Sequence, residues 1–194
     1  MGGPGAGKST TASALFAKMK RSYYNVELVT EYAKDMVWEE RHKIFGEQDY
    51  ITAQQNKRLR RLIGKVDFAI TDSPILLGMC YIPQDYYISC FRQFIWEIFS
   101  SYNNLNFYIE REKGYVQIGR NQSASEAMEK DNLMYNVLKT YQVPFHSIAG
   151  NEHAEDDIFK VVKAYAKENG IQPVIAAKVA DAKHRKQLET ESPL

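Results

Sequence analysis

The chain has few cysteines and no long hydrophobic run, and these two absences exclude several classes of protein. Its 194 residues include only Cys80 and Cys90, and their separation does not match that of metal-ligating pairs. We therefore expect free thiols in a reducing cytoplasm rather than disulfides or a zinc site. No apolar run has transmembrane length and no signal peptide precedes the first motif, so we expect a cytoplasmic protein with no membrane partner.

A large excess of charge of one sign is also missing. The chain carries 25 Lys and Arg against 24 Asp and Glu, a formal net charge of +1. With 44% hydrophobic and 25% charged residues, its composition is typical of one soluble globular domain and not of a chain that coats nucleic acid. A local basic run at residues 57–61 could contact a polyanionic acceptor or form a solvated helix face.

What the sequence has instead is a glycine-rich loop at its start. Residues 2–9 read Gly-Gly-Pro-Gly-Ala-Gly-Lys-Ser, the G-x-x-x-x-G-K-S spacing of a phosphate-binding loop. The glycines let the backbone curve so that its amides and the following helix N-terminus face a polyphosphate. The lysine would lie on the β- and γ-phosphates, and the serine hydroxyl could ligate Mg²⁺. The residues expected to bind the nucleotide are Gly2, Gly3, Gly5, Ala6, Gly7, Lys8, Ser9 and Thr10.

No strand precedes this loop in the sequence. A phosphate-binding loop normally joins the first, central strand of a parallel sheet to its helix. Because the loop begins at residue 2, we expect either a truncated start or another segment in the place of that strand. The loop keeps its chemistry in both cases, but the sheet loses a strand on which its stability depends.

The rest of the chain alternates between strand and helix patterns. Such alternation predicts an α/β fold with a parallel sheet that is covered by helices on both faces. The expected helices span residues 9–20, 33–41, 48–63, 86–101, 123–141 and 154–169, and the expected strands span residues 26–29, 67–72, 106–109 and 143–148. Gly170 and Pro173 mark the end of the domain, so we expect one domain over residues 1–170 and a helical or flexible tail over residues 171–194.

Two carboxylates stand at the ends of expected strands, which is where ligands of open parallel sheets bind. Asp72 would hold Mg²⁺ through water or take a proton from an acceptor hydroxyl. Asp72-Ser73-Pro74 is also typical of a helix start, with Asp72 as its N-cap. Glu31 would face the γ-phosphate and accept a proton or clamp a sugar, or it could simply complement a helix dipole.

Residues 111–122 have the composition of a lid. Arg111 and Arg120 carry guanidinium groups that bind phosphate in a bidentate manner, and Gly114 and Gly119 would act as hinges. Phosphoryl transfer needs cations at the moving group, and a closing lid also excludes water. The alternative is a solvated charged loop.

Four motifs in this order resemble those of small P-loop kinases. They are the loop with its following threonine (residues 2–10), Thr-Glu-Tyr-Ala at 30–33, Thr-Asp-Ser-Pro at 71–74, and Gly-Arg-Asn-Gln at 119–122 together with Asp131. The pattern is similar to the group that contains ribosylnicotinamide kinase domains and the related kinases of tailed bacteriophages. These phage relatives are often described as ATPases and include enzymes that phosphorylate 5-hydroxymethyluracil in DNA. The resemblance covers roughly residues 2–165.

The resemblance implies a P-loop NTPase three-layer sandwich with a parallel sheet of order 2-3-1-4-5, of which the first strand is missing or truncated here. It implies ATP with Mg²⁺, Ser9 and Asp72 at the metal, and Asp72 as metal ligand or base. Lys8 would bind phosphates, Glu31 would face the acceptor, and Arg111 and Arg120 would belong to the lid. A phage origin would place the protein in the host cytoplasm.

Together these observations predict transfer of the γ-phosphoryl group of ATP to a hydroxyl or phosphate of a nucleoside-like or nucleotide-like acceptor. The net charge near zero favours a small acceptor over a base within DNA, although a hydroxymethylated base in DNA is a possible substrate. The alternative from another class is an ATPase or switch that acts through a partner protein.

Overall fold

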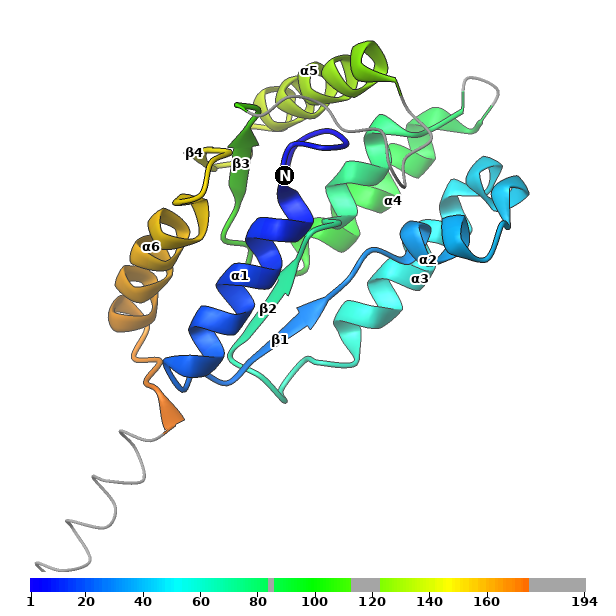
Figure 1. Ribbon diagram of the computed structural model, residues 1–194. Coiled ribbons are helices and arrows are strands. Elements are labelled where there is room, and N and C mark those ends of the chain that lie inside the picture. The colour runs from blue at the N-terminus through cyan, green and yellow to red at the C-terminus, as the bar shows by residue number, and fades with distance from the viewer. Residues whose placement is uncertain (84–85, 113–122, 175–194) are drawn as a thin grey trace, which may run out of the picture.

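The strands form two parallel pairs. The computed structural model describes residues 1–83, 86–112 and 123–174 (Figure 1). The strands are β1 (Val26–Val29), β2 (Phe68–Thr71), β3 (Phe107–Glu110) and β4 (His146–Ala149). β1 pairs with β2 and β3 pairs with β4, each in parallel. This is a mixed α/β fold with short parallel sheets, and the arrangement of the two pairs within one sheet stays a prediction.

Helices connect the strands in the expected alternation. The helices are α1 (Lys8–Arg21), α2 (Tyr32–Trp38), α3 (Gln48–Arg60), α4 (Ile88–Ser100), α5 (Ala124–Thr140) and α6 (Ala154–Glu168), with short 3₁₀ segments η1 (His42–Gly46) and η2 (Ile75–Cys80). In the part of the chain that the structure describes, no helix combines the length and apolarity needed to cross a membrane. The elements lie where the sequence patterns predict them, within about three residues at each end.

The differences at element ends have local causes. The helix expected over residues 33–41 ends at Trp38, because Glu40 takes φ 56° and the amide of Arg41 bonds back to Met36 O at 2.9 Å. The strand expected over residues 143–148 begins only at His146. The amide of Val143 still bonds to Leu138 O at the end of α5, and Pro144 has no amide hydrogen to donate to a ladder.

Two hydrophobic clusters lie on opposite sides of the strands. One contains buried residues of η2, α4 and α5, and the other contains buried residues of α1, α6, β1 and β4. Adjacent residues of β3 divide between them, since Tyr108 joins the first cluster and Ile109 the second. Figure 1 shows α1 and α6 side by side, and they pack together through the second cluster. β3 is therefore buried on both faces.

The described chain ends beside the C-terminal end of α1. After α6, the amide of Ile171 bonds to Ala166 O at 2.8 Å and that of Val174 bonds to Tyr23 O at 2.8 Å. The tail expected over residues 171–194 lies mostly outside the described residues, so the division into domain and tail stays a prediction.

Candidate functional site

The phosphate-loop motif forms a tight loop that leads into α1. Gly7 is the N-cap of α1 and has φ 97°, a left-handed conformation that glycine adopts without strain. No side chain caps this helix, and its first turn contains no acidic residue. Helix geometry leaves the first amides without intrahelical acceptors, so the N-terminus of α1 can receive an anion.

Asp131 of α5 holds the phosphate loop in place. Asp131 accepts a hydrogen bond from the amide of Gly3 through one carboxylate oxygen and from Nε of Arg111 at 2.7 Å through the other. Nη2 of Arg111 continues to the carbonyl of Pro4 at 2.7 Å. The side chains of Arg111 and Asp131 are only 16% and 14% exposed, which strengthens their attraction. Sequence reasoning noted Asp131 only through the resemblance and missed this role.

The backbone passes so close to α5 at Gly3 that a side chain has no room there. A Cβ atom on Gly3 would lie 2.5 Å from Ala127 O and 2.7 Å from Oδ1 of Asp131. Because the nearest neighbour is a backbone atom of a packed helix, the loop itself would have to move.

Lys8 lies among the carboxylates that the sequence predicted for the site. Its Nζ donates to the carbonyl of Gly3 at 2.8 Å, across the loop. Burial lowers the pKa of Lys8 from its ordinary value, and the carboxylates of Glu31 and Asp72 act against this shift. Both carboxylates are therefore close enough to interact with the ammonium, and Lys8 and Asp72 also line one cavity.

Asp72 is buried directly after the end of β2. The residue is 8% exposed, and its Oδ1 has no hydrogen-bond partner among the described residues. The N-cap interpretation of Asp72 is wrong, because Pro74 is the N-cap of η2 and no side chain caps that element. The amide of Ser73 bonds instead to Oγ1 of Thr71 at 3.1 Å. A buried carboxylate oxygen without a donor is suited to a ligand that brings positive charge.

Glu31 is placed by the side chain of a buried glutamine. Gln55 of α3 accepts from the amide of Tyr32 at 2.9 Å and donates to Thr30 O at 3.3 Å and to Oγ1 of Thr71 at 3.4 Å. These bonds tie the ends of β1 and β2 together. Glu31 occupies the N-cap position of α2, but its carboxylate makes no capping hydrogen bond. Burial raises the pKa of Glu31, and the charge of Lys8 opposes this shift.

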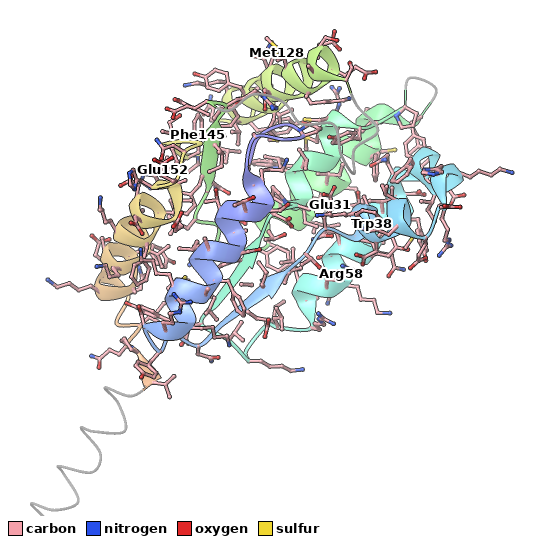
Figure 2. The ribbon with its side chains drawn as sticks, viewed as in Figure 1. Glu31, Trp38, Arg58, Met128, Phe145 and Glu152 are labelled. Atoms are coloured by element: carbon pink, nitrogen blue, oxygen red, sulfur yellow. The ribbon has the colours of Figure 1, made fainter. Side chains whose placement is uncertain are left out.

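One arginine of the basic run has a structural role. Arg58 forms an ion pair with Asp35, donates to Thr30 O at 3.3 Å, and lies 5.1 Å from the ring of Tyr32. It thereby holds α2 against α3. Figure 2 shows Arg58, Trp38 and Glu31 on the same part of the molecule.

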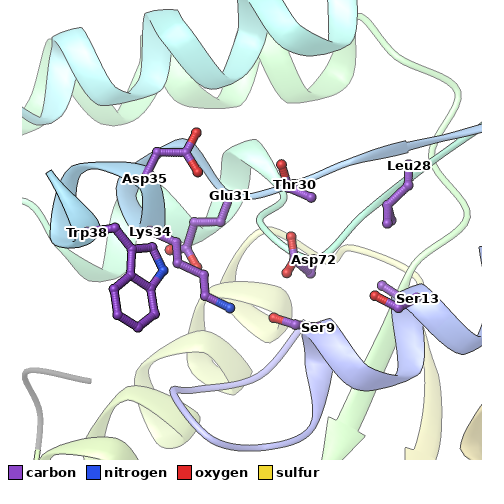
Figure 3. A pocket seen from close by; sticks show the side chains of 10 residues that line it. Ser9, Ser13, Leu28, Thr30, Glu31, Lys34, Asp35, Trp38 and Asp72 are labelled. Atoms are coloured by element: carbon purple, nitrogen blue, oxygen red, sulfur yellow. The ribbon is translucent and has the colours of Figure 1, made fainter. Parts of the chain in front are cut away.

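These elements enclose a cavity of about 240 Å³ beside the loop. It is lined by Ser9, Ala12, Ser13, Leu28, Thr30, Glu31, Lys34, Asp35, Trp38 and Asp72. Figure 3 shows the carboxylates of Glu31 and Asp72 and the ammonium of Lys34 turned toward Ser9. Trp38 is 69% exposed, so its indole forms a wall of the cavity that is also in contact with solvent. Sequence reasoning missed Lys34 and Trp38, whose only signal is their place one helical turn apart after Glu31.

The expected lid lies largely outside the described residues. Arg120 and residues 113–122 belong to that part of the chain, so their role stays a prediction. Arg111 is bonded to Asp131 and to the carbonyl of Pro4 in the phosphate loop, a position that the lid interpretation did not anticipate.

The residues of the site are suited to a Mg²⁺ ion that also binds phosphate and water oxygens, and not to a metal held by protein side chains alone. Among the described residues, no group of three or more His, Cys, Asp and Glu could hold a metal. Mg²⁺ in nucleotide sites takes one or two protein oxygens, and phosphate and water oxygens complete its shell. Ser9 and Asp72 line the same cavity, and Oδ1 of Asp72 has no hydrogen-bond partner among the described residues.

The fold and the loop define a P-loop nucleotide-binding domain of the α/β class. The family model described as AAA domain matches residues 1–155, which include every described site residue, and the chain belongs to this family. The comparison with curated proteins found no match. Membership of the family indicates that the protein binds and uses a nucleoside triphosphate.

Replacing Gly3 with alanine tests the close contact between the loop and α5. We expect Gly3→Ala to lower the free energy of unfolding by about 1–3 kcal/mol and to weaken ATP binding, because the loop must shift. Urea unfolding and calorimetric titration with ATP and Mg²⁺ measure the two effects. Gly46→Ala is the matched control, since a Cβ there meets nothing within 4 Å. Unchanged binding and stability in Gly3→Ala would contradict the placement of the loop.

Glu31 gives a stability prediction that depends on pH. The native pKa of Glu31 is raised above its ordinary 4.5, so the folded protein binds the proton more tightly than the unfolded chain. Stability from this group is present at low pH and is lost as pH rises through the raised pKa. Glu31→Gln should therefore unfold at higher urea than wild type at pH 8 and at the same urea at pH 4.

The control for this comparison is Glu152→Gln. Glu152 is exposed and lies well away from Glu31 (Figure 2). We expect its substitution to leave the urea midpoint unchanged at both pH values. A midpoint of Glu31→Gln that equals wild type at pH 8 would show that the carboxylate is solvated.

Proposed function

We propose that the protein is an ATP- and Mg²⁺-dependent phosphotransferase that acts on a nucleoside-like or nucleotide-like acceptor. The observation that carries this proposal is the cavity next to Ser9. Its volume of about 240 Å³ is about eight times the ~30 Å³ share of one water molecule. Hydrolysis needs room for one water only, whereas transfer needs room for an organic acceptor beside the phosphate loop.

The triphosphate would lie on the loop and the N-terminus of α1. In this proposal Gly2, Gly3, Gly5, Ala6, Gly7, Lys8, Ser9 and Thr10 form the loop around its oxygens. The amides of Gly3 and Ala6 are already bonded to Asp131 and to Gly3 O, so the other amides of the loop would bind the phosphates. The ammonium of Lys8 would exchange its bond with Gly3 O for the β- and γ-phosphates. Ser9 and Asp72 would hold Mg²⁺, which supplies positive charge to the phosphate oxygens when bound.

Glu31 would act in the transfer step itself. The acceptor hydroxyl oxygen forms a bond to the γ-phosphorus, the bond from that phosphorus to the β–γ bridging oxygen breaks, and ADP leaves. The hydroxyl proton passes to Glu31, whose raised pKa makes it a stronger base than an ordinary carboxylate. Arg111 keeps the loop in place through its bond to the carbonyl of Pro4. Arg120 and the rest of residues 111–122 would close over the phosphates as a lid.

Trp38 supports an acceptor with a planar ring. Its indole is 69% exposed at the wall of the cavity, and exposed indoles stack on nucleobases. The net charge of +1 favours a free nucleoside or nucleotide over DNA, because a DNA-binding protein gains affinity from excess positive charge.

A panel of acceptors tests the proposed reaction. ADP release is measured with nucleosides, nucleotides and DNA that carries a hydroxymethylated base, and the products are analysed by mass. We expect one class to stimulate ADP release and to yield an equal amount of phosphorylated acceptor, with no turnover in Lys8→Ala. Trp38→Ala should raise KM for that acceptor and leave kcat nearly unchanged. Phosphate release that no acceptor alters would favour the ATPase or switch instead.

Asp72→Asn tests the second carboxylate. The substitution keeps the shape of the side chain but removes its charge, so kcat should fall by about 100-fold or more through loss of a metal ligand or base. Asp157→Asn is the control, because Asp157 lies on α6, where it pairs with Lys160 at 2.8 Å, and should keep wild-type kinetics. Wild-type kinetics in Asp72→Asn would remove this residue from the mechanism.

A further inference from the structure

Lys34 is the only positively charged residue among those that line the cavity beside the phosphate loop. Three carboxylates, those of Glu31, Asp35 and Asp72, line the same cavity. Asp35 forms an ion pair with Arg58, whereas in the described part of the chain neither Glu31 nor Asp72 forms an ion pair. Negative charge that a ligand brought into this cavity would therefore meet one cationic lining group, the ammonium of Lys34.

No contact within the described residues occupies this ammonium. Lys34 is exposed, and its Nζ has neither a hydrogen-bond acceptor nor an ion-pair partner among the residues that the structure describes. The adjacent carboxylate of Asp35 bonds to Arg58 of α3 instead. Figure 3 shows the ammonium of Lys34 turned toward Ser9, in the first turn of α1. It is thus directed at the position where the end of a triphosphate on the loop would lie.

The start of α2 brings three different groups to this cavity. Glu31 is the N-cap of α2, Lys34 follows one turn later and Trp38 another turn on, a spacing that places side chains on one face of a helix. Burial raises the pKa of Glu31, and the charges of Lys8 and Lys34 both oppose this shift. The ammonium of Lys34 is therefore close enough to act on the carboxylate that we propose as the base.

A γ-phosphate beside Ser9 would need a cation on the side of the acceptor. Its equatorial oxygens carry the negative charge of the moving group, and Lys8 would reach them from the loop. Mg²⁺ would compensate Asp72, but the carboxylate of Glu31 would repel the same phosphate oxygens. Lys34 lies beside Glu31 and can offset this repulsion.

We propose that Lys34 is a catalytic residue that binds the γ-phosphate of the nucleotide from the acceptor side. This inference rests on the proposed function, which places the triphosphate on the loop and the acceptor in the cavity. The ammonium donates to the γ-phosphate oxygens while the bond from phosphorus to the acceptor oxygen forms and that to the bridging oxygen breaks. Lys34 itself forms no covalent bond and transfers no proton, because the hydroxyl proton passes to Glu31 and the bridging oxygen leaves with ADP.

Two nucleotides that differ by the γ-phosphate test this contact without turnover. Calorimetry with Mg²⁺ gives the dissociation constants of ADP and of the β,γ-imido analogue of ATP. Lys34→Met keeps the length of the side chain and removes its charge, so we expect it to weaken binding of the analogue about 10-fold and to leave ADP binding unchanged. Lys34→Arg should restore most of the lost affinity. The matched control is Lys43→Met, since Lys43 is exposed on η1 and does not line the cavity.

Two results of this titration would overturn the proposal. One is an affinity of Lys34→Met for the analogue that equals that of wild type. The other is an equal loss of affinity for ADP and for the analogue, because the γ-phosphate would then not be the group that Lys34 binds. An unchanged affinity for the analogue, together with a raised KM for phosphorylated acceptors alone, would assign Lys34 to a phosphate of the acceptor instead.

Turnover separates this inference from the proposed function. With an acceptor that wild type phosphorylates, Lys34→Met should lower kcat about 100-fold and change KM for the acceptor little, the opposite of Trp38→Ala. A wild-type kcat in Lys34→Met would overturn the catalytic role of Lys34 and leave the phosphotransferase standing. If wild type phosphorylates no acceptor, the phosphotransferase is wrong, and the comparison of ADP with the analogue still decides whether Lys34 binds the γ-phosphate.

Discussion

The carboxylate of Asp131 is the contact on which the phosphate loop depends. One oxygen holds the amide of Gly3 and the other holds Arg111, which continues to the carbonyl of Pro4. A glycine-rich segment has many accessible conformations, and its ordering costs more entropy than that of other residues. The buried ion pair of Asp131 and Arg111 bonds to the backbone at two successive residues, Gly3 and Pro4, and so stabilises one of these conformations. The first amides of α1, which no side chain caps, remain available to a ligand.

The site beyond the loop combines a cation with carboxylates in a poorly solvated space. Burial lowers the pKa of Lys8 and raises that of Glu31, so both groups are less stable as ions than they would be in water. A bound triphosphate would compensate Lys8, and a divalent cation would compensate the oxygen of Asp72 that has no hydrogen-bond partner among the described residues. The buried charges that lower the stability of the fold are therefore those that a nucleotide and its metal would stabilise.

Local patterns were sufficient to predict the loop, the alternation of strands and helices, and the positions of Glu31 and Asp72 at strand ends. Each depends on residues adjacent in sequence. The structural roles of Asp131 and Gln55 could not be predicted in this way. Asp131 binds Gly3 across a separation of 128 residues, and Gln55 connects two strand ends from the interior of a helix. Both are polar residues within amphipathic helices, where the pattern predicts only a solvated side chain.

The two ends of the phosphate loop are tied to different parts of the fold. Met1 is bonded to β3 on one side of the loop, and α1 is packed against α6 on the other. The loop is thus held at both ends and at Gly3 between them, and these contacts fix its shape. Asp72 lines both the cavity beside Ser9 and a second cavity of about 310 Å³, which Lys8 also lines, so its carboxylate lies where the contacts of the loop and those of the neighbouring strand meet.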